Sequence, residues 1–191
     1  FGSKPDTSKS KTDEIDVGTA SSPIDETFTI NFNKNGGKFL YCETINEVQG
    51  FLHDIIEENN WNHKNTLIHD KQLEDKFKSF KFNSTQKIEE ADFLFTTCES
   101  LIASDGSILI SSNQIAEKKL IELPENFVVF ATTSQFVTTI SEGLQNIKVK
   151  SKTKIPSNIT TIKHFKVNDN NDFLSYGSSS KNLYLLLLED L

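Results

Sequence analysis

Residues 127–131 read Phe-Val-Val-Phe-Ala, an unbroken apolar run that follows the turn-forming segment Leu123-Pro124-Glu125-Asn126. A strand with one face in water alternates apolar and polar residues, whereas a continuous run is typical of a strand covered on both faces. Residues 183–188, Leu-Tyr-Leu-Leu-Leu-Leu, have the same character. The two runs predict central strands of a sheet that is buried on both sides.

Alternating strand and helix patterns surround these two runs. Thr44-Ile-Asn-Glu47 matches the S/T-x-x-E capping box, so a helix is expected behind it, and Asp70 and Ser134 are caps for two more helices. Shorter strands are expected at residues 27–32, 38–42, 67–69, 93–97 and 160–164. Strands that alternate with helices predict an α/β fold with a mostly parallel sheet flanked by helices.

One part of the chain departs from this parallel pattern. Asp105-Gly106 lies between the apolar segments 100–104 and 107–111. A D-G pair in this position favours a tight hairpin turn, because type I′ turns need a positive φ at both central residues. The sequence therefore predicts one antiparallel hairpin within the α/β fold.

The length of 191 residues and the hydrophobic content of 36% suit one domain and a tail. Residues 1–26 are rich in Ser, Thr, Asp and Lys, so we expect a disordered or weakly ordered N-terminal tail before a single α/β domain over residues 27–191. No apolar run approaches the roughly 20 residues that cross a bilayer, so no membrane span is expected. The first residues form no apolar signal segment, and a cytoplasmic location is the expectation.

The charge balance narrows the classes of partner. The chain has 20 basic and 27 acidic residues, a formal net charge of -7, and every basic residue is lysine. Nucleic-acid-binding proteins usually present a basic surface, so no nucleic-acid partner is expected. Without the planar fork of arginine, an anion site has to use lysine, hydroxyl groups or backbone N–H groups.

Motifs for metal, nucleotide and nucleophilic chemistry are missing from the sequence. Cys42 and Cys98 form no C-x-x-C pair and are expected to be reduced, buried thiols. The four histidines have no metal-ligand spacing, and no P-loop, GxGxxG or GxSxG occurs. We expect no metal and no cofactor, and assign no catalytic residue.

Two loops are candidates for holding a small anion. Ser104-Asp105-Gly106-Ser107 combines a carboxylate, hydroxyls and a flexible backbone, and Gly177-Ser-Ser-Ser-Lys181 offers consecutive N–H and O–H donors beside one positive charge. The alternative is that both are ordinary serine-rich turns. If both loops lie on the same sheet edge, a pocket forms between them. The candidate ligand-binding residues are Asp105, Gly106, Ser107, Gly177, Ser178, Ser179, Ser180 and Lys181.

The same segments carry a family resemblance. Ala91-Asp92 with residues 100–110 resembles the strand–turn–strand of the LUD domain, and Leu123-Pro124 with residues 127–129 resembles its L-P-x-x-hydrophobic strand. Residues 177–181 resemble its late G-P-S-[RK] loop, so the likeness spans about residues 40–191. The family includes lactate-utilisation protein C, and the resemblance implies a fold similar to the NagB/RpiA/CoA-transferase-like fold.

Several family residues are replaced. Ser104-Asp105 stands where the family has Glu-Thr, Ser107 where it has Thr, and Ser178 where it has Pro. The A-D-I-E continuation of the late loop and the later H-G-P segment are absent. The chain therefore resembles a short, divergent member.

The resemblance implies an accessory component of lactate utilisation, the oxidation of L-lactate to pyruvate, in which iron–sulfur partner subunits hold the redox cofactors. The alternative is a small-molecule-binding protein or an enzyme of the isomerase/CoA-transferase-like class. It would hold a phosphorylated or CoA-linked ligand between the Asp105 loop and residues 178–181, with Glu99 the nearest carboxylate nucleophile. A third reading is an interaction module with a degenerate pocket. A binder responds to free anionic ligands, whereas an accessory subunit responds to a protein partner.

Overall fold

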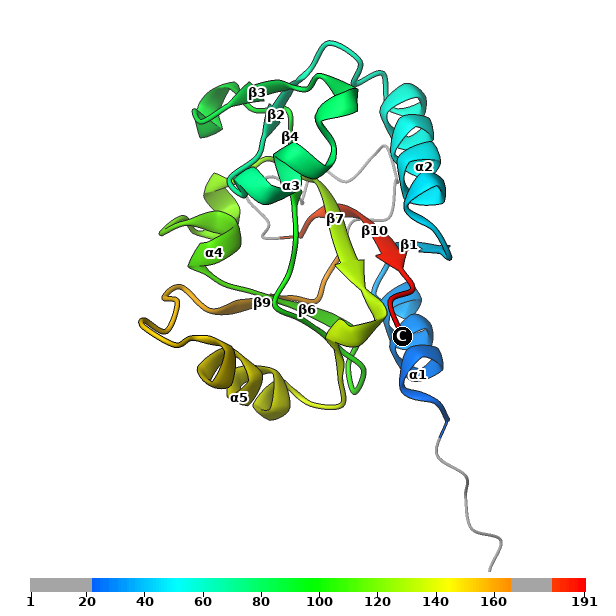
Figure 1. Ribbon diagram of the computed structural model, residues 1–191, viewed down its shortest axis with the longest axis vertical. Coiled ribbons are helices and arrows are strands. Elements are labelled where there is room, and N and C mark those ends of the chain that lie inside the picture. The colour runs from blue at the N-terminus through cyan, green and yellow to red at the C-terminus, as the bar shows by residue number, and fades with distance from the viewer. Residues whose placement is uncertain (1–21, 166–179) are drawn as a thin grey trace, which may run out of the picture.

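A six-stranded parallel sheet forms the centre of the protein in a computed structural model that describes residues 22–165 and 180–191 (Figure 1). The strand order is β1-β10-β7-β4-β2-β3, and every neighbouring pair is parallel. The strands are β1 (Lys38–Cys42), β10 (Asn182–Leu188), β7 (Asn126–Thr132), β4 (Phe93–Thr96), β2 (Asn65–Leu67) and β3 (Asn83–Thr85). This arrangement confirms the α/β class and the mostly parallel sheet.

The two apolar runs form neighbouring strands inside this sheet, as predicted. β10 pairs with β7 over its whole length and with β1 on its other side. Val128 and Val129, which point to opposite faces, are both fully buried. Burial on both faces explains why neither strand shows an apolar–polar alternation.

Helices cover one face of the sheet. α2 (Ile45–Glu58) buries Val48, Leu52 and Ile55 there, and α3 (Lys71–Lys76) adds Leu73. The predicted caps are confirmed for both helices, because the side chains of Thr44 and Asp70 accept hydrogen bonds from backbone N–H groups of the first turn.

A four-stranded sheet and α1 (Ile24–Lys34) cover the opposite face. This second sheet has the order β8-β5-β6-β9. α5 (Ile140–Lys150) lies on its outer side, away from β7, and buries Ile147 against Ile102, Leu109 and Val137 (Figure 1). Its strands are β8 (Phe136–Val137), β5 (Ser100–Ile102), β6 (Ser107–Ile110) and β9 (Thr160–Ile162).

The predicted hairpin is confirmed as the antiparallel pair β5 and β6. The tight D-G turn expected within it is wrong. Ile102 pairs with Ser107, so residues 103–106 form a longer loop, and Gly106 has a positive φ of 68° while Asp105 does not. Loops longer than two residues need one left-handed residue rather than two, and glycine takes that position here.

The strand predicted at residues 27–32 is wrong, because these residues belong to α1. Phe28 and Phe32 are buried and lie four positions apart, a spacing that fits one helix face as well as alternate strand positions. Ile30 is 50% exposed on the other side of the helix. Asp25 and Glu26 in the first turn, after Pro23, are the helix signals that the strand prediction overlooked.

The helix expected behind Ser134 begins later, at Ile140, and Thr139 is its cap. Val137 lies instead in β8, where it pairs with Ile102 and accepts a hydrogen bond from the backbone N–H of Ala103. Ser134 lies in the short η4 helix (Thr133–Gln135). The pairing with β5, which is distant in sequence, makes residues 136–137 a strand rather than the start of a helix.

The other predicted strands and helices are found with small shifts of boundary, whereas β3 and α4 were not predicted. β2 begins two residues before the expected strand, and β9 ends at Ile162. The predicted tail and the single domain over residues 27–191 stay predictions: α1 already begins at Ile24, and residues 1–21 lie outside the described residues. Short helices complete the fold: α4 (Ser112–Ile115), η1 (Lys78–Phe80), η2 (Ile88–Glu90) and η3 (Leu120–Glu122).

None of the helices in the described ranges is long and apolar enough to cross a membrane.

Replacement of Gly106 by alanine should destabilise the fold by more than about 2 kcal/mol. A Cβ atom there would lie 2.4 Å from Asn31 C and Phe32 N, backbone atoms of α1, and the positive φ adds strain. The control is Gly50→Ala in α2, where a Cβ atom would meet nothing within 4 Å. Because alanine favours the helix more than glycine does, this substitution should stabilise the protein by about 0.5–1 kcal/mol. Urea unfolding of both variants measures this, and equal effects would contradict the packing of the hairpin loop on α1.

Candidate functional site

The hairpin loop with Asp105, Gly106 and Ser107 is fastened to the rest of the fold. Asp105 Oδ1 accepts hydrogen bonds from the backbone N–H and the hydroxyl of Ser107, at 3.1 and 2.6 Å. Asn35 Nδ2 donates to the carbonyl oxygen of Asp105 at 2.7 Å, and Lys163 Nζ lies 3.6 Å from Asp105 Oδ2. These contacts hold the loop against α1 and β9.

The late loop lies only partly within the described residues. Gly177, Ser178 and Ser179 fall outside them, and Ser180 precedes β10. Lys181 is 3% exposed, and its Nζ donates to the carbonyl oxygen of Leu123 at 3.1 Å and lies 5.4 Å from the centre of the Phe127 ring. The described contacts turn the Lys181 side chain into the protein.

Asn35 and Phe165 connect the Asp105 loop to Lys181. The Asn35 side chain donates to Asp105, and its backbone oxygen accepts a hydrogen bond from Phe165 N–H at 3.0 Å. Phe165 in turn forms a parallel bridge with Lys181. The structure therefore links the Asp105 loop to Lys181, the last residue of the candidate late loop, and an anion site between the two loops stays a prediction.

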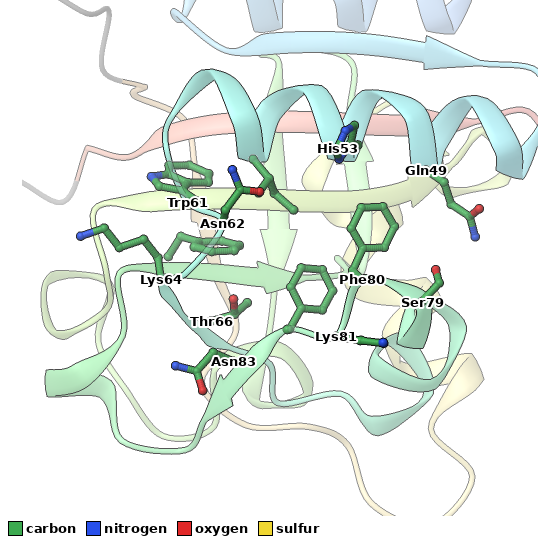
Figure 2. A pocket seen from close by; sticks show the side chains of 13 residues that line it. Gln49, His53, Trp61, Asn62, Lys64, Thr66, Ser79, Phe80, Lys81 and Asn83 are labelled. Carbon is green, nitrogen blue, oxygen red and sulfur yellow. The ribbon is translucent and has the colours of Figure 1, made fainter.

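A different region has the shape of a ligand site. A cleft of about 330 Å³ lies between α2 on one side and η1 with β3 on the other, over the first residues of β2 and β4 (Figure 2). We call it the α2 cleft. It is lined by Gln49, His53, Ile56, Trp61, Asn62, Lys64, Thr66, Ser79, Phe80, Lys81, Phe82, Asn83 and Phe93.

Two stacked pairs of aromatic rings form the apolar part of the α2 cleft. Trp61 stacks on Phe93 with ring centres 4.6 Å apart, and Phe80 stacks on Phe82 at 5.5 Å. Lys81 lies between the second pair in the left-handed region, with φ 49°. This unusual backbone ends η1 and allows residues 80 and 82 to stack.

The ionisable side chains of the α2 cleft are His53, Lys64 and Lys81, and none of them is a carboxylate. His53 Nε2 lies 3.3 Å from Glu57 Oε1, and Lys64 Nζ lies 3.7 Å from Asp92 Oδ1, but Lys81 has no ion pair with any described carboxylate. A cationic cleft in a chain of net charge -7 favours an anionic ligand.

The carboxyl edge of the large sheet carries a separate polar network. Asp190 accepts hydrogen bonds from Ser134 N, Ser134 Oγ and Thr133 Oγ1. Burial alone would raise the pKa of Asp190, but these bonds outweigh it and lower the pKa to about 2. A hydrogen bond to the Glu189 carboxylate, with burial and nearby acidic groups, raises the pKa of Tyr41 to about 12.

Glu99 and the two cysteine thiols, the nucleophile candidates in the sequence, have structural roles. Glu99 Oε1 accepts from Ser111 Oγ at 2.6 Å and Asn113 Nδ2 at 2.8 Å, so it supports the N-terminus of α4. Both thiols are buried, as predicted, and burial raises the pKa of Cys98 and brings that of Cys42 to about 11. Across residues 22–165 and 180–191, no cluster of three His, Cys, Asp or Glu side chains could hold a metal.

The α2 cleft was missed by the sequence reasoning. The signal that points to it is the segment 78–83, Lys-Ser-Phe-Lys-Phe-Asn, in which lysines and aromatic residues alternate. Trp61 could not be connected with this segment from sequence, because α3 and the loop after it separate them along the chain.

Comparisons with known proteins agree with this fold. The family model described as the LUD domain matches residues 26–188. The chain is also similar to a solved DUF162 family protein from Deinococcus radiodurans, with a TM-score of 0.62 and 14% sequence identity, over 87% of this chain and 96% of that chain. A search of the curated proteins finds no match.

Replacement of Lys181 by alanine should lower the free energy of unfolding by about 2 kcal/mol, because it removes packing on Phe127 and leaves the Leu123 carbonyl without this donor. Lys152→Ala, at an exposed lysine, should change it by less than about 0.5 kcal/mol. Urea titration distinguishes the two. An unchanged stability for Lys181→Ala would return Lys181 to the candidate anion site.

The Asp190 carboxyl should make a stabilising contribution that depends on pH. Its pKa is lowered from 3.8 in the ordinary case to about 2 in the folded protein. The contribution is therefore complete above about pH 4 and is lost as the pH falls through 2. Carboxyl NMR titration gives the pKa directly, and the stability difference between wild type and Asp190→Asn should shrink toward about pH 2. A difference that does not change with pH would contradict the hydrogen-bonded carboxylate.

Proposed function

The chain belongs to the LUD domain family, and from this premise we propose that it is an accessory protein of lactate utilisation that binds a small organic anion in the α2 cleft. The observation that carries the proposal is the composition of the cleft lining, which combines His53, Lys64 and Lys81 and includes no carboxylate. Pockets of a few hundred cubic ångströms with a few polar groups are typical ligand sites.

Lys81 is the principal anion-binding group in this proposal. Its ammonium group is exposed and lies at one end of the cleft with Ser79 beside it, while Lys64 lies at the other end next to Asn62 (Figure 2). Lysine contributes as a point charge and needs no fixed geometry, which suits a carboxylate or a phosphate. Neither group has to be buried before the ligand arrives, so no desolvated charge destabilises the empty site.

The accessory role follows from the chemistry that the chain lacks in its sequence. An iron–sulfur cluster is commonly held by four cysteines, and this sequence has two. In lactate oxidation the electron-carrying groups would therefore belong to iron–sulfur partner subunits. The contribution of this chain would be the binding of an anionic ligand beside them.

The single tryptophan gives a direct test, since Trp61 lines the α2 cleft and no other tryptophan contributes to the emission. Titration with lactate, pyruvate, inorganic phosphate and ribose 5-phosphate should produce a saturable change in fluorescence with at least one of them. The affinity should fall as salt is raised, because the attraction is electrostatic.

Lys81→Asn is the matched variant, because asparagine tolerates a positive φ and removes the charge. It should weaken binding about tenfold, the equivalent of about 1.4 kcal/mol, while the melting temperature stays unchanged. Lys152→Asn, far from the cleft lining, should bind as wild type does. Equal affinities for the two variants, or no saturable change with any of the four anions, would overturn the proposal.

A further inference from the structure

We infer that the ligand of the α2 cleft carries a planar heteroaromatic ring as well as a phosphate, as a mononucleotide does. This inference rests on the proposed function and adds the class of ligand. Two features beyond the charge of the cleft carry it: the aromatic rings that line it and the amide side chains beside them.

The aromatic residues pack on the hydrophobic core and also line the α2 cleft. Trp61 is 8% exposed, with one face on Phe93 and its edge on Tyr184, and still lines the cleft. Phe80 and Phe82 are only half-buried and lie nearly parallel, at 10°. Figure 2 shows Phe80 standing between α2 and the strands, so its ring is available to a flat partner in the cleft. Stacking of a base on an aromatic side chain strengthens binding by about 1–3 kcal/mol.

Amide side chains supply the groups that a heteroaromatic ring would need. Gln49, Asn62 and Asn83 line the cleft, and amides offer donors and an acceptor for ring nitrogens and exocyclic groups. Asn83 Nδ2 already donates to Asn65 Oδ1, so Gln49 and Asn62 carry this argument. Thr66, 1% exposed, adds a hydroxyl at the floor between them (Figure 2). A carboxylate such as lactate would use the cations and leave the amides of Gln49 and Asn62 without a role.

The positions of the cations agree with a ligand longer than a simple anion. Figure 2 shows Lys64 and Lys81 at opposite ends of the cleft, with the aromatic residues between them. A phosphate at one end leaves the middle of the cleft for a sugar and a ring. The volume of about 330 Å³ lies in the range that holds such ligands.

A nucleic-acid polymer is disfavoured by the rest of the surface. The net charge of -7 would repel a chain of phosphates outside the cleft, whereas a single phosphate monoester meets only the local lysines. The class we infer is therefore a free nucleoside monophosphate.

The experiment compares ligands that share one part each, with Trp61 fluorescence as the readout. Adenosine 5′-monophosphate and uridine 5′-monophosphate contain a ring, a ribose and a phosphate. Ribose 5-phosphate lacks the ring, and adenosine lacks the phosphate. At least one of the two nucleotides should bind about tenfold more tightly than either partial ligand. Excitation at the red edge of the tryptophan band avoids absorption by the bases.

Two variants separate the contributions of ring and charge. Phe80→Leu should weaken nucleotide binding about tenfold and leave ribose 5-phosphate unchanged. Lys81→Asn should weaken the nucleotide and ribose 5-phosphate by a similar factor and leave adenosine unchanged. Melting temperatures confirm that both variants fold.

The outcomes distinguish this inference from the proposed function. If neither nucleotide binds more tightly than ribose 5-phosphate, or if Phe80→Leu weakens nucleotide and ribose 5-phosphate equally, the ring is not recognised. This inference is then wrong, and the proposed anion binding is unaffected. If no phosphate-bearing or carboxylate ligand binds, both the proposed function and this inference are wrong. If single-stranded oligonucleotides bind more tightly than mononucleotides, a polymer is the ligand and the inference is overturned.

Discussion

The structure depends on β10, the strand that lies between β1 and β7 and pairs with both in parallel. Every residue of this strand up to Leu187 is buried, so each face of the sheet has to be covered by other parts of the chain. α2 and α3 cover one face, and the four-stranded sheet with α1 covers the other. The requirement to bury a two-sided apolar sheet thus determines where α1, α2, α3 and the four-stranded sheet lie.

The α2 cleft is a consequence of this cover. α2 packs on β10 and β1, at one side of the sheet, and leaves the first residues of β2 and β4 to be covered by the segment that follows α3. That segment turns sharply at Lys81, and its aromatic side chains reach only part of the way to α2. The gap between α2 and this segment is lined by aromatic rings and polar side chains from both.

The sequence predicts local structure well where one physical reason dominates. Continuous apolar runs marked β7 and β10, and the cap residues Thr44 and Asp70 marked α2 and α3, because these signals act over a few residues. Phe28 and Phe32 were assigned wrongly because two periodicities fit the same spacing. Val137 was assigned wrongly because its pairing with Ile102 is distant in sequence. The α2 cleft could not be predicted for a similar reason, since Trp61 and Lys81 line one cleft only after α2, β2 and α3 have packed.

The central position of β10 also affects the rate of folding. β1 and β10 pair Lys38 with Tyr184, so the sheet closes through contacts between the two ends of the domain, and such contacts slow folding. Until β10 is synthesised, β1 and β7 each present an open edge, and exposed edges invite pairing with other chains. During translation, two strand edges therefore stay open to other chains until β10 is inserted between β1 and β7.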